Sequence, residues 1–190
     1  QYDCRDHSFY REFHGWSNAL TDAHIQFSVV HEDDLDRLDD EFTVLILPHA
    51  VCLRDFSFNG RIIATGNSGT YCPTGEKRAV PLFEETSPLG EFDVAGLPTP
   101  VTVLEAPANF LVRAVHTDSG CLVHLLNCGD KRGSDIAISI PGMIRAKLLS
   151  PDMKEALTLS ILGDTVRFPA ASFATYAVLH CSPLAERVES

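Results

Sequence analysis

The sequence predicts a small α/β domain over residues 1–98 followed by an antiparallel β-sandwich over residues 99–190. The first observation is charge: residues 1–100 carry 17 of the chain's 26 acidic and 7 of its 15 basic side chains, whereas residues 101–190 carry 9 and 8. The second is hydrophobic pattern, which changes near Pro100 from helical spacing and continuous apolar runs to short strands separated by turns. Both observations indicate two units.

The first predicted element is a helix over residues 8–23. Ser8 stands where an N-cap is expected, and apolar side chains then recur at helical spacing. The apolar stripe consists of Phe9, Phe13, Trp16 and Leu20. Such a stripe must face a packed surface, so we expect it to contact its own sheet, another copy or another domain.

Three short apolar runs follow the helix, at residues 26–31, 43–48 and 60–66. Continuous apolar runs that end at Pro or Gly are typical of strands buried on both faces of a parallel sheet. We therefore expect three parallel strands in one sheet.

This α/β domain looks incomplete. The connection between the second and third runs, residues 49–59, has only 11 residues and no helical pattern, which is the lower limit for a parallel crossover. The chain also opens at a helix rather than at a strand. We interpret the sequence as a fragment, or as one from which unordered residues of the chain are left out. The central strand of the sheet is then upstream or absent.

The second half contains seven predicted strands at the spacing of a β-sandwich. Residues 117–120 form a hairpin signal, and Pro141-Gly142 and Gly163-Asp164 are further turn signals. The predicted strands cover residues 101–105, 110–116, 121–126, 136–140, 146–149, 165–168 and 174–180. The intervening segment 67–99 holds four of the chain's 11 prolines and is predicted to be linker and loops.

Composition excludes several classes of function. The net charge is −11 and no stripe of Lys and Arg is present, so a nucleic-acid partner is not expected. No run approaches the roughly 18–20 apolar residues of a membrane span. The six cysteines form no C-x-x-C pair, and Cys121, Cys128 and Cys181 lie in apolar runs where we expect them to act as small hydrophobic residues. The sequence leaves the cellular compartment open, with the cytoplasm favoured.

Acidic residues do not form a convincing metal or catalytic site. The run at residues 32–41 lacks the central Gly of a calcium loop, so it is interpreted as a solvated turn whose Leu35 and Leu38 contact the core. A glycosidase needs two carboxyl groups that face each other across the scissile bond. Glu84 and Glu85 are adjacent and would diverge, and Glu105 has no visible partner. We predict no catalytic, cofactor-binding or metal-binding residue.

Nucleophile and histidine patterns lead to the same prediction. Residues 66–70, Gly-Asn-Ser-Gly-Thr, follow a strand but do not match G-x-S-x-G, and Cys72 is too far along to be the nucleophile of an elbow. His116 and His124 flank a hairpin turn and are expected on adjacent strands, where a single cross-strand pair is more often an exposed pair than a zinc site.

The order of motifs resembles a known family. In sequence order, a helix end, a strand, an acidic segment and two further strands resemble the amidotransferase-like trimerisation domain that follows the barrel in family 42 β-galactosidases. These motifs are residues 20–25, 27–30, 33–36, 44–48, 59–66 and Tyr71. Later motifs resemble the β-sandwich that closes those enzymes: residues 107–113, 122–127, 148–152 and 176–179. The resemblance covers nearly the whole chain.

The resemblance implies a flavodoxin- or amidotransferase-like parallel sheet followed by a sandwich, in a modular glycoside hydrolase. It implies as partners an upstream catalytic (β/α)8 barrel of the same polypeptide, further copies in a homo-oligomer, and the carbohydrate substrate of the parent enzyme. The barrel is absent here, so the family's catalytic residues have no positions in this chain. Two alternatives stay open: a carbohydrate-binding or adhesion module, which would need solvent-facing aromatic residues, and an independent small-molecule hydrolase or amidotransferase, which lacks a nucleophile and base.

Overall fold

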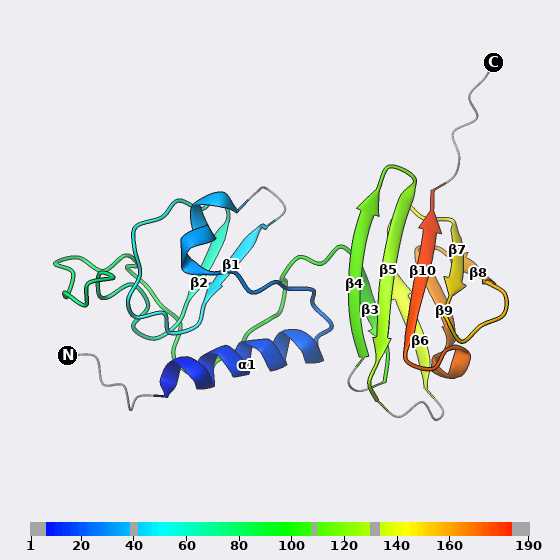
Figure 1. The fold of residues 1–190 in the computed structure, drawn as a ribbon, viewed down its shortest axis with the longest axis horizontal. Helices are drawn as coiled ribbons and strands as arrows, with labels where there is room; N and C mark the ends of the chain where they lie inside the picture. Colours follow the sequence, from blue (N-terminus) through cyan, green and yellow to red (C-terminus); the bar gives the residue numbers. More distant parts are fainter. Residues whose placement is uncertain (1–6, 39–41, 108–109, 130–133, 184–190) are drawn as a thin grey trace, which may run out of the picture. The chain divides into compact units, whose positions relative to one another are not determined.

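The computed structural model describes residues 7–38, 42–107, 110–129 and 134–183, and the fold is mostly β (Figure 1). These residues fall into two compact units. The first comprises Gln1–Leu20 and Phe27–Pro98, and the second comprises Thr21–Gln26 and Thr99–Ser190. In the described part of the chain, no helix is long and apolar enough to cross a membrane.

The described residues of the first unit form one α-helix, one 3-10 helix and a two-stranded parallel sheet. Its elements are α1 (Ser8–Asp22), η1 (Glu32–Arg37), β1 (Val44–Leu47) and β2 (Arg61–Ala64). The two strands pair in parallel, from Val44 opposite Arg61 to Leu47 opposite Ala64, as predicted. Their connection contains no helix, which also agrees with the sequence analysis. Leu35 of η1 packs into the small core beside Leu45 and Leu47.

The third parallel strand was predicted wrongly. Residues 26–31 form no strand, and Phe27 and Val29 are exposed. The start of this segment belongs to the second unit, where the Gln26 side chain accepts a hydrogen bond from the backbone N–H of Ala114, at 2.7 Å. Ala114 lies on the outermost strand of the second unit, whose unpaired backbone groups need such partners.

The buried line of α1 differs from the predicted apolar stripe. It runs through Ser8, Glu12, Trp16 and Leu20. The backbone N–H of Gly90 donates to Glu12 Oε1 at 2.6 Å, which accounts for a carboxylate on the buried line. Phe92 packs edge-on against Trp16, with ring centroids 5.7 Å apart. Phe9 is exposed and Phe13 is half-buried, and these two rings stack on each other.

The second unit is one eight-stranded antiparallel sheet in the order β3-β6-β9-β8-β7-β10-β5-β4 (Figure 1). Its strands are β3 (Thr102–Glu105), β4 (Phe110–Thr117), β5 (Gly120–Asn127), β6 (Asp135–Ser139), β7 (Arg145–Leu149), β8 (Leu157–Leu162), β9 (Thr165–Pro169) and β10 (Tyr176–Ser182). A short 3-10 helix, η2 (Ala170–Ser172), precedes β10.

The sheet changes direction at β8. Residues 157–160 pair with β7, whereas Ile161 and Leu162 pair with β9. The sheet therefore curls, and its two halves share one hydrophobic core, as in a β-sandwich. This core includes Phe110 and Leu125 from one half and Ile138 and Phe168 from the other.

All seven strands predicted in this half are present, and residues 117–120 close the β4–β5 hairpin. The eighth strand, β8, was missed. Residues 157–160 alternate apolar and hydroxyl side chains, and most residues of β8 are exposed. No continuous apolar run therefore marks β8 in the sequence.

Candidate functional site

The carboxyl ends of β1 and β2 are where a parallel α/β sheet usually binds ligands. Here a side chain of the segment after β2 is used in hydrogen bonds to the backbone. The Ser68 hydroxyl is buried, lies 3.0 Å from Leu47 O and 2.8 Å from Thr65 O, and accepts the Ala50 N–H at 2.9 Å. Its hydrogen-bonding capacity is used in joining the two strand ends. Ser68 is therefore a structural hydroxyl rather than an exposed nucleophile.

His49 completes this turn. Its backbone N–H donates to Thr65 Oγ1 at 3.0 Å, and its Nδ1 accepts from Asn67 N at 3.2 Å. His49 has a φ of 51°, and Gly66, with a φ of 56°, packs against its imidazole ring. A Cβ at position 66 would lie 2.3 Å from His49 Nδ1, so glycine is required for this close approach. The sequence analysis did not single out His49, because it lies in a loop without a recognisable motif.

The described part of the acidic run is held by an arginine. Arg54 Nη1 lies 3.0 Å from Asp36 Oδ2, and the Arg54 side chain also donates to the main-chain oxygens of Glu32 and Asp33. Leu35 is buried and Leu38 half-buried, as expected of a turn that packs its leucines inward. Residues 39–41 of the run lie outside the described residues. Among the residues that are described, no group of three His, Cys, Asp or Glu could hold a metal ion.

The three glutamates considered from the sequence belong to different units. Glu84 and Glu85 are exposed in a loop of the first unit, whereas Glu105 lies on β3 of the second. Glu105 pairs with Arg167 of β9, and Asp135 of β6 lies 3.9 Å from the same guanidinium. These charges form an ion-pair network on the outside of the sheet.

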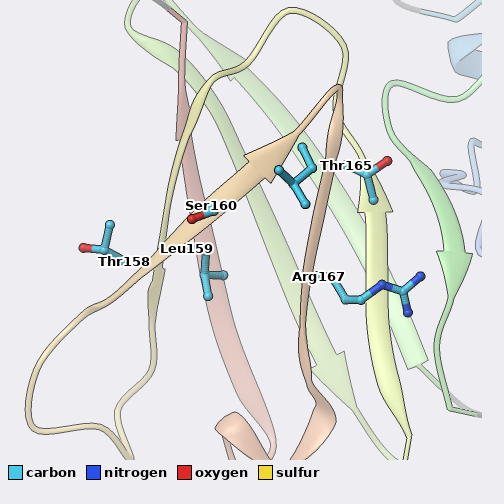
Figure 2. Close-up of a pocket in the computed structure, with 6 residues that line it drawn as sticks. Thr158, Leu159, Ser160, Thr165 and Arg167 are labelled. Atoms are coloured by element: carbon cyan, nitrogen blue, oxygen red, sulfur yellow. The ribbon is translucent and has the colours of Figure 1, made fainter.

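A shallow pocket of about 520 Å³ opens where β8 leaves β9 to pair with β7 (Figure 2). Its lining residues are Thr158, Leu159, Ser160, Leu162, Thr165 and Arg167. Figure 2 shows that Thr158 and Arg167 point in opposite directions and that the labelled side chains do not converge on one point. Arg167 is also engaged by two carboxylates. This pocket therefore offers no constellation for catalysis.

The two histidines near the β4–β5 turn do not form the cross-strand pair considered from the sequence. His116 lies opposite Cys121, whereas His124 lies opposite Arg113. His124 instead contacts Tyr176 of β10: its Nδ1 lies 2.7 Å from the Tyr176 hydroxyl, and the two rings stack with centroids 6.1 Å apart. Tyr176 is 39% exposed, so the pair forms an aromatic surface open to solvent.

The cysteines divide by environment. Cys121 and Cys181 are fully buried and lie opposite each other on β5 and β10. Burial raises the pKa of both thiols, and burial together with the neighbouring Cys121 raises the pKa of Cys181 to about 12. Cys128, expected from the sequence to be another small hydrophobic residue, is exposed because it follows the end of β5.

This difference predicts a labelling pattern. A raised pKa leaves the thiol protonated at pH 8, and the thiolate is the reactive species. We expect iodoacetamide at pH 8 to modify Cys128 at least about 100-fold faster than Cys121 or Cys181, because burial also blocks access. Peptide mapping by mass spectrometry measures the rates, with the chain unfolded in concentrated guanidinium as the control in which all three react. Labelling of Cys181 as fast as that of Cys128 in the folded protein would contradict the assignment.

Together, these features define a two-unit, mostly β protein with a small parallel sheet and a curled antiparallel sheet. No protein-family model matches the chain, and no curated protein matches it. Among solved structures, the chain is similar to the apo exo-carrageenase GH42 from Bacteroides ovatus, with a TM-score of 0.46 and 12% sequence identity. The match covers 88% of this chain and 26% of that chain, so this chain spans about a quarter of the solved protein's length.

Proposed function

We propose that the chain is the non-catalytic C-terminal portion of a modular, β-galactosidase-like glycoside hydrolase. Its role in this proposal is oligomer assembly and support of an upstream catalytic (β/α)8 barrel. The order of sequence motifs supports the family, and the succession of a parallel α/β unit and an antiparallel β unit fits the same order.

The observation that carries the assembly role is the exposed apolar surface of the first unit. Tyr10 is 61% exposed and Val29 67%, and Phe9 and Phe27 are also exposed. A parallel sheet is normally covered on both faces, and two strands are too few to bury all these side chains. Phe9 contacts both Tyr10 and Phe13, with ring centroids 5.7 and 6.0 Å apart, and an exposed apolar cluster of this kind marks a contact site for other proteins. We therefore propose that this surface binds the barrel or another copy.

Sedimentation velocity over a range of concentrations tests the assembly role. We expect the wild-type chain to associate with itself or with a separately produced barrel. The double variant Tyr10→Ser/Val29→Ser is expected to weaken that association at least about tenfold, because two exposed apolar side chains leave the contact. Val80→Ser is the matched control, since Val80 is 75% exposed in the same unit. A chain that stays monomeric and does not bind the barrel would contradict the proposal.

A second prediction concerns catalysis. We expect purified residues 1–190 to hydrolyse no aryl glycoside above background, because a glycosidase needs two carboxyl groups that face each other. Release of the aryl group, followed by absorbance, measures this. Turnover that disappears in Glu84→Gln or Glu105→Gln would show that the chain carries its own active site.

One observation favours the alternative of a carbohydrate-binding module. The sole tryptophan, Trp16, is buried in the first unit and cannot stack on a sugar. Tyr176, however, is a solvent-facing aromatic side chain held in place by His124. An aromatic ring fixed on the outside of a sheet is the kind of surface on which the apolar face of a sugar ring can pack.

A further inference from the structure

Tyr176 lies on the side of β4, β5, β10 and β7 that faces away from the core of the second unit. These four strands are neighbours in the sheet, and we call this side the outer face (Figure 1). Side chains alternate along these strands, and one set, including Ala114, Leu125, Leu148 and Leu179, is buried in the core. The other set points away from the core. Strand register places Arg113 opposite His124, and Lys147 opposite His180.

The outer face is cationic although the chain is acidic overall. Arg113, Arg145 and Lys147 are exposed on it, and the side chain of none of the three is hydrogen-bonded or ion-paired to another described residue. No residue of β4, β5, β7 or β10 is Asp or Glu. The net charge of the chain is −11, so this set of uncompensated cations contrasts with the rest of the molecule.

The other half of the same sheet shows the contrast within one unit. There, Arg167 is paired with Glu105 and approached by Asp135. Near the outer face, Asp118 lies in the β4–β5 turn, and Asp152 lies in the loop after β7, where it accepts the Ala174 N–H at 2.9 Å. Neither carboxylate is paired with a cation of the outer face. The charge of that face is therefore available to an external anion.

Apolar side chains lie between these cations. Leu111 and Val115 are each 40% exposed on β4, and Leu149 is 44% exposed on β7. Tyr176 lies on β10, between β7 and β5. Three strand spacings, about 14 Å, separate β4 from β7. Strand register places Leu149 across from Arg113, and Lys147 lies about 7 Å further along β7 from that point. Arg145 lies about 7 Å from Lys147 along β7, because two residues separate successive side chains on one face.

We propose that the outer face binds an anionic polysaccharide, a polymer whose sugar rings carry sulfate or carboxylate groups. The apolar faces of the sugar rings pack on Tyr176 and the neighbouring aliphatic side chains. The anionic groups pair with Arg113, Arg145 and Lys147, since guanidinium and ammonium groups form charge-assisted hydrogen bonds with such oxygens. The choice of a saccharide over another polyanion rests on the proposed carbohydrate setting. The charge pattern itself requires only an anion.

The test compares polymers with one backbone and different charge. We expect the 190-residue chain to bind dextran sulfate but not neutral dextran in isothermal titration calorimetry, and the affinity to fall as salt is raised. The triple variant Arg113→Gln/Arg145→Gln/Lys147→Gln is expected to lose at least about tenfold in affinity, because three surface ion pairs are removed. Lys77→Gln, an exposed cation of the first unit, is the control and should leave affinity unchanged. Circular dichroism checks that each variant is folded.

A second variant separates a saccharide site from a general anion site. Tyr176→Ala should weaken dextran sulfate binding severalfold and leave inorganic polyphosphate binding unchanged, because only the sugar rings pack on the aromatic side chain. Equal effects on both polymers, an undiminished affinity in the triple variant, or no binding of dextran sulfate would each overturn the proposal. Self-association lost in the triple variant, without polymer binding, would instead assign the outer face to a second copy of the chain. None of these outcomes depends on Tyr10, Val29 or hydrolysis, so the proposed assembly role is tested separately.

Discussion

Replacing Phe110 with alanine is expected to lower the free energy of unfolding of the second unit by about 3–5 kcal/mol. Phe110 begins β4, is completely buried, and lies in the core shared by both halves of the curled sheet. Its ring centroid is 6.5 Å from that of Phe173 and 6.3 Å from that of His24. Truncation removes buried apolar area and leaves a cavity that a close-packed core fills only partly.

Urea denaturation followed by circular dichroism measures this loss. Leu111→Ala is the matched control, because Leu111 is the next residue of the same strand and is 40% exposed on the outer face. It should cost less than about 1 kcal/mol. Equal losses at the two positions would mean that the inward and outward assignment of β4, and with it the outer face, is wrong.

The second large effect is expected at Gly120, the first residue of β5. Gly120 has a φ of 144°, and a Cβ there would lie 2.1 Å from the backbone oxygen of Cys181. A backbone oxygen inside a paired sheet cannot move aside as a flexible side chain can. Gly120→Ala is therefore expected to cost about 2–4 kcal/mol, from the overlap and the unfavourable φ together.

The control for this prediction is Gly163→Ala in the β8–β9 turn. Gly163 also has a positive φ, 61°, but an added Cβ would meet no atom within 4 Å. Only the backbone cost of about 1–2 kcal/mol is expected there. If thermal unfolding shows the same loss for both variants, the close approach of β5 to β10 at Gly120 is not rigid.

Local patterns predicted much of the fold. The apolar runs at β1 and β2 and the turn at residues 117–120 carry their signal within a few residues, and both were predicted correctly. Two of the errors arose where a distant partner decides the structure. Residues 26–31 have a strand pattern, but the Gln26 side chain accepts a hydrogen bond from Ala114, which is far along the chain. Glu12 lies on the buried line of α1 because it accepts the N–H of Gly90, a contact that helical spacing cannot reveal.

The candidate site was less accessible to sequence reasoning than the fold. Each strand of the outer face carries an ordinary alternation of side chains, and Arg113, Lys147 and Tyr176 are far apart in the sequence. They come onto one face only because β10 lies between β5 and β7, an order that does not follow the chain. The absence of acidic residues from β4, β5, β7 and β10 was visible in the sequence, but it has meaning only once these strands are known to be neighbours.

The most direct test of the central claim is the mass and activity of the polypeptide as its source cell makes it. Intact-mass measurement on the natural protein, with an assay for glycoside hydrolysis, is predicted to give a mass well above the 20.8 kDa of this chain and measurable turnover. Separately produced residues 1–190 should show no turnover. A natural polypeptide of 20.8 kDa, or a longer one without glycosidase activity, would contradict the assignment to an accessory region of a glycoside hydrolase.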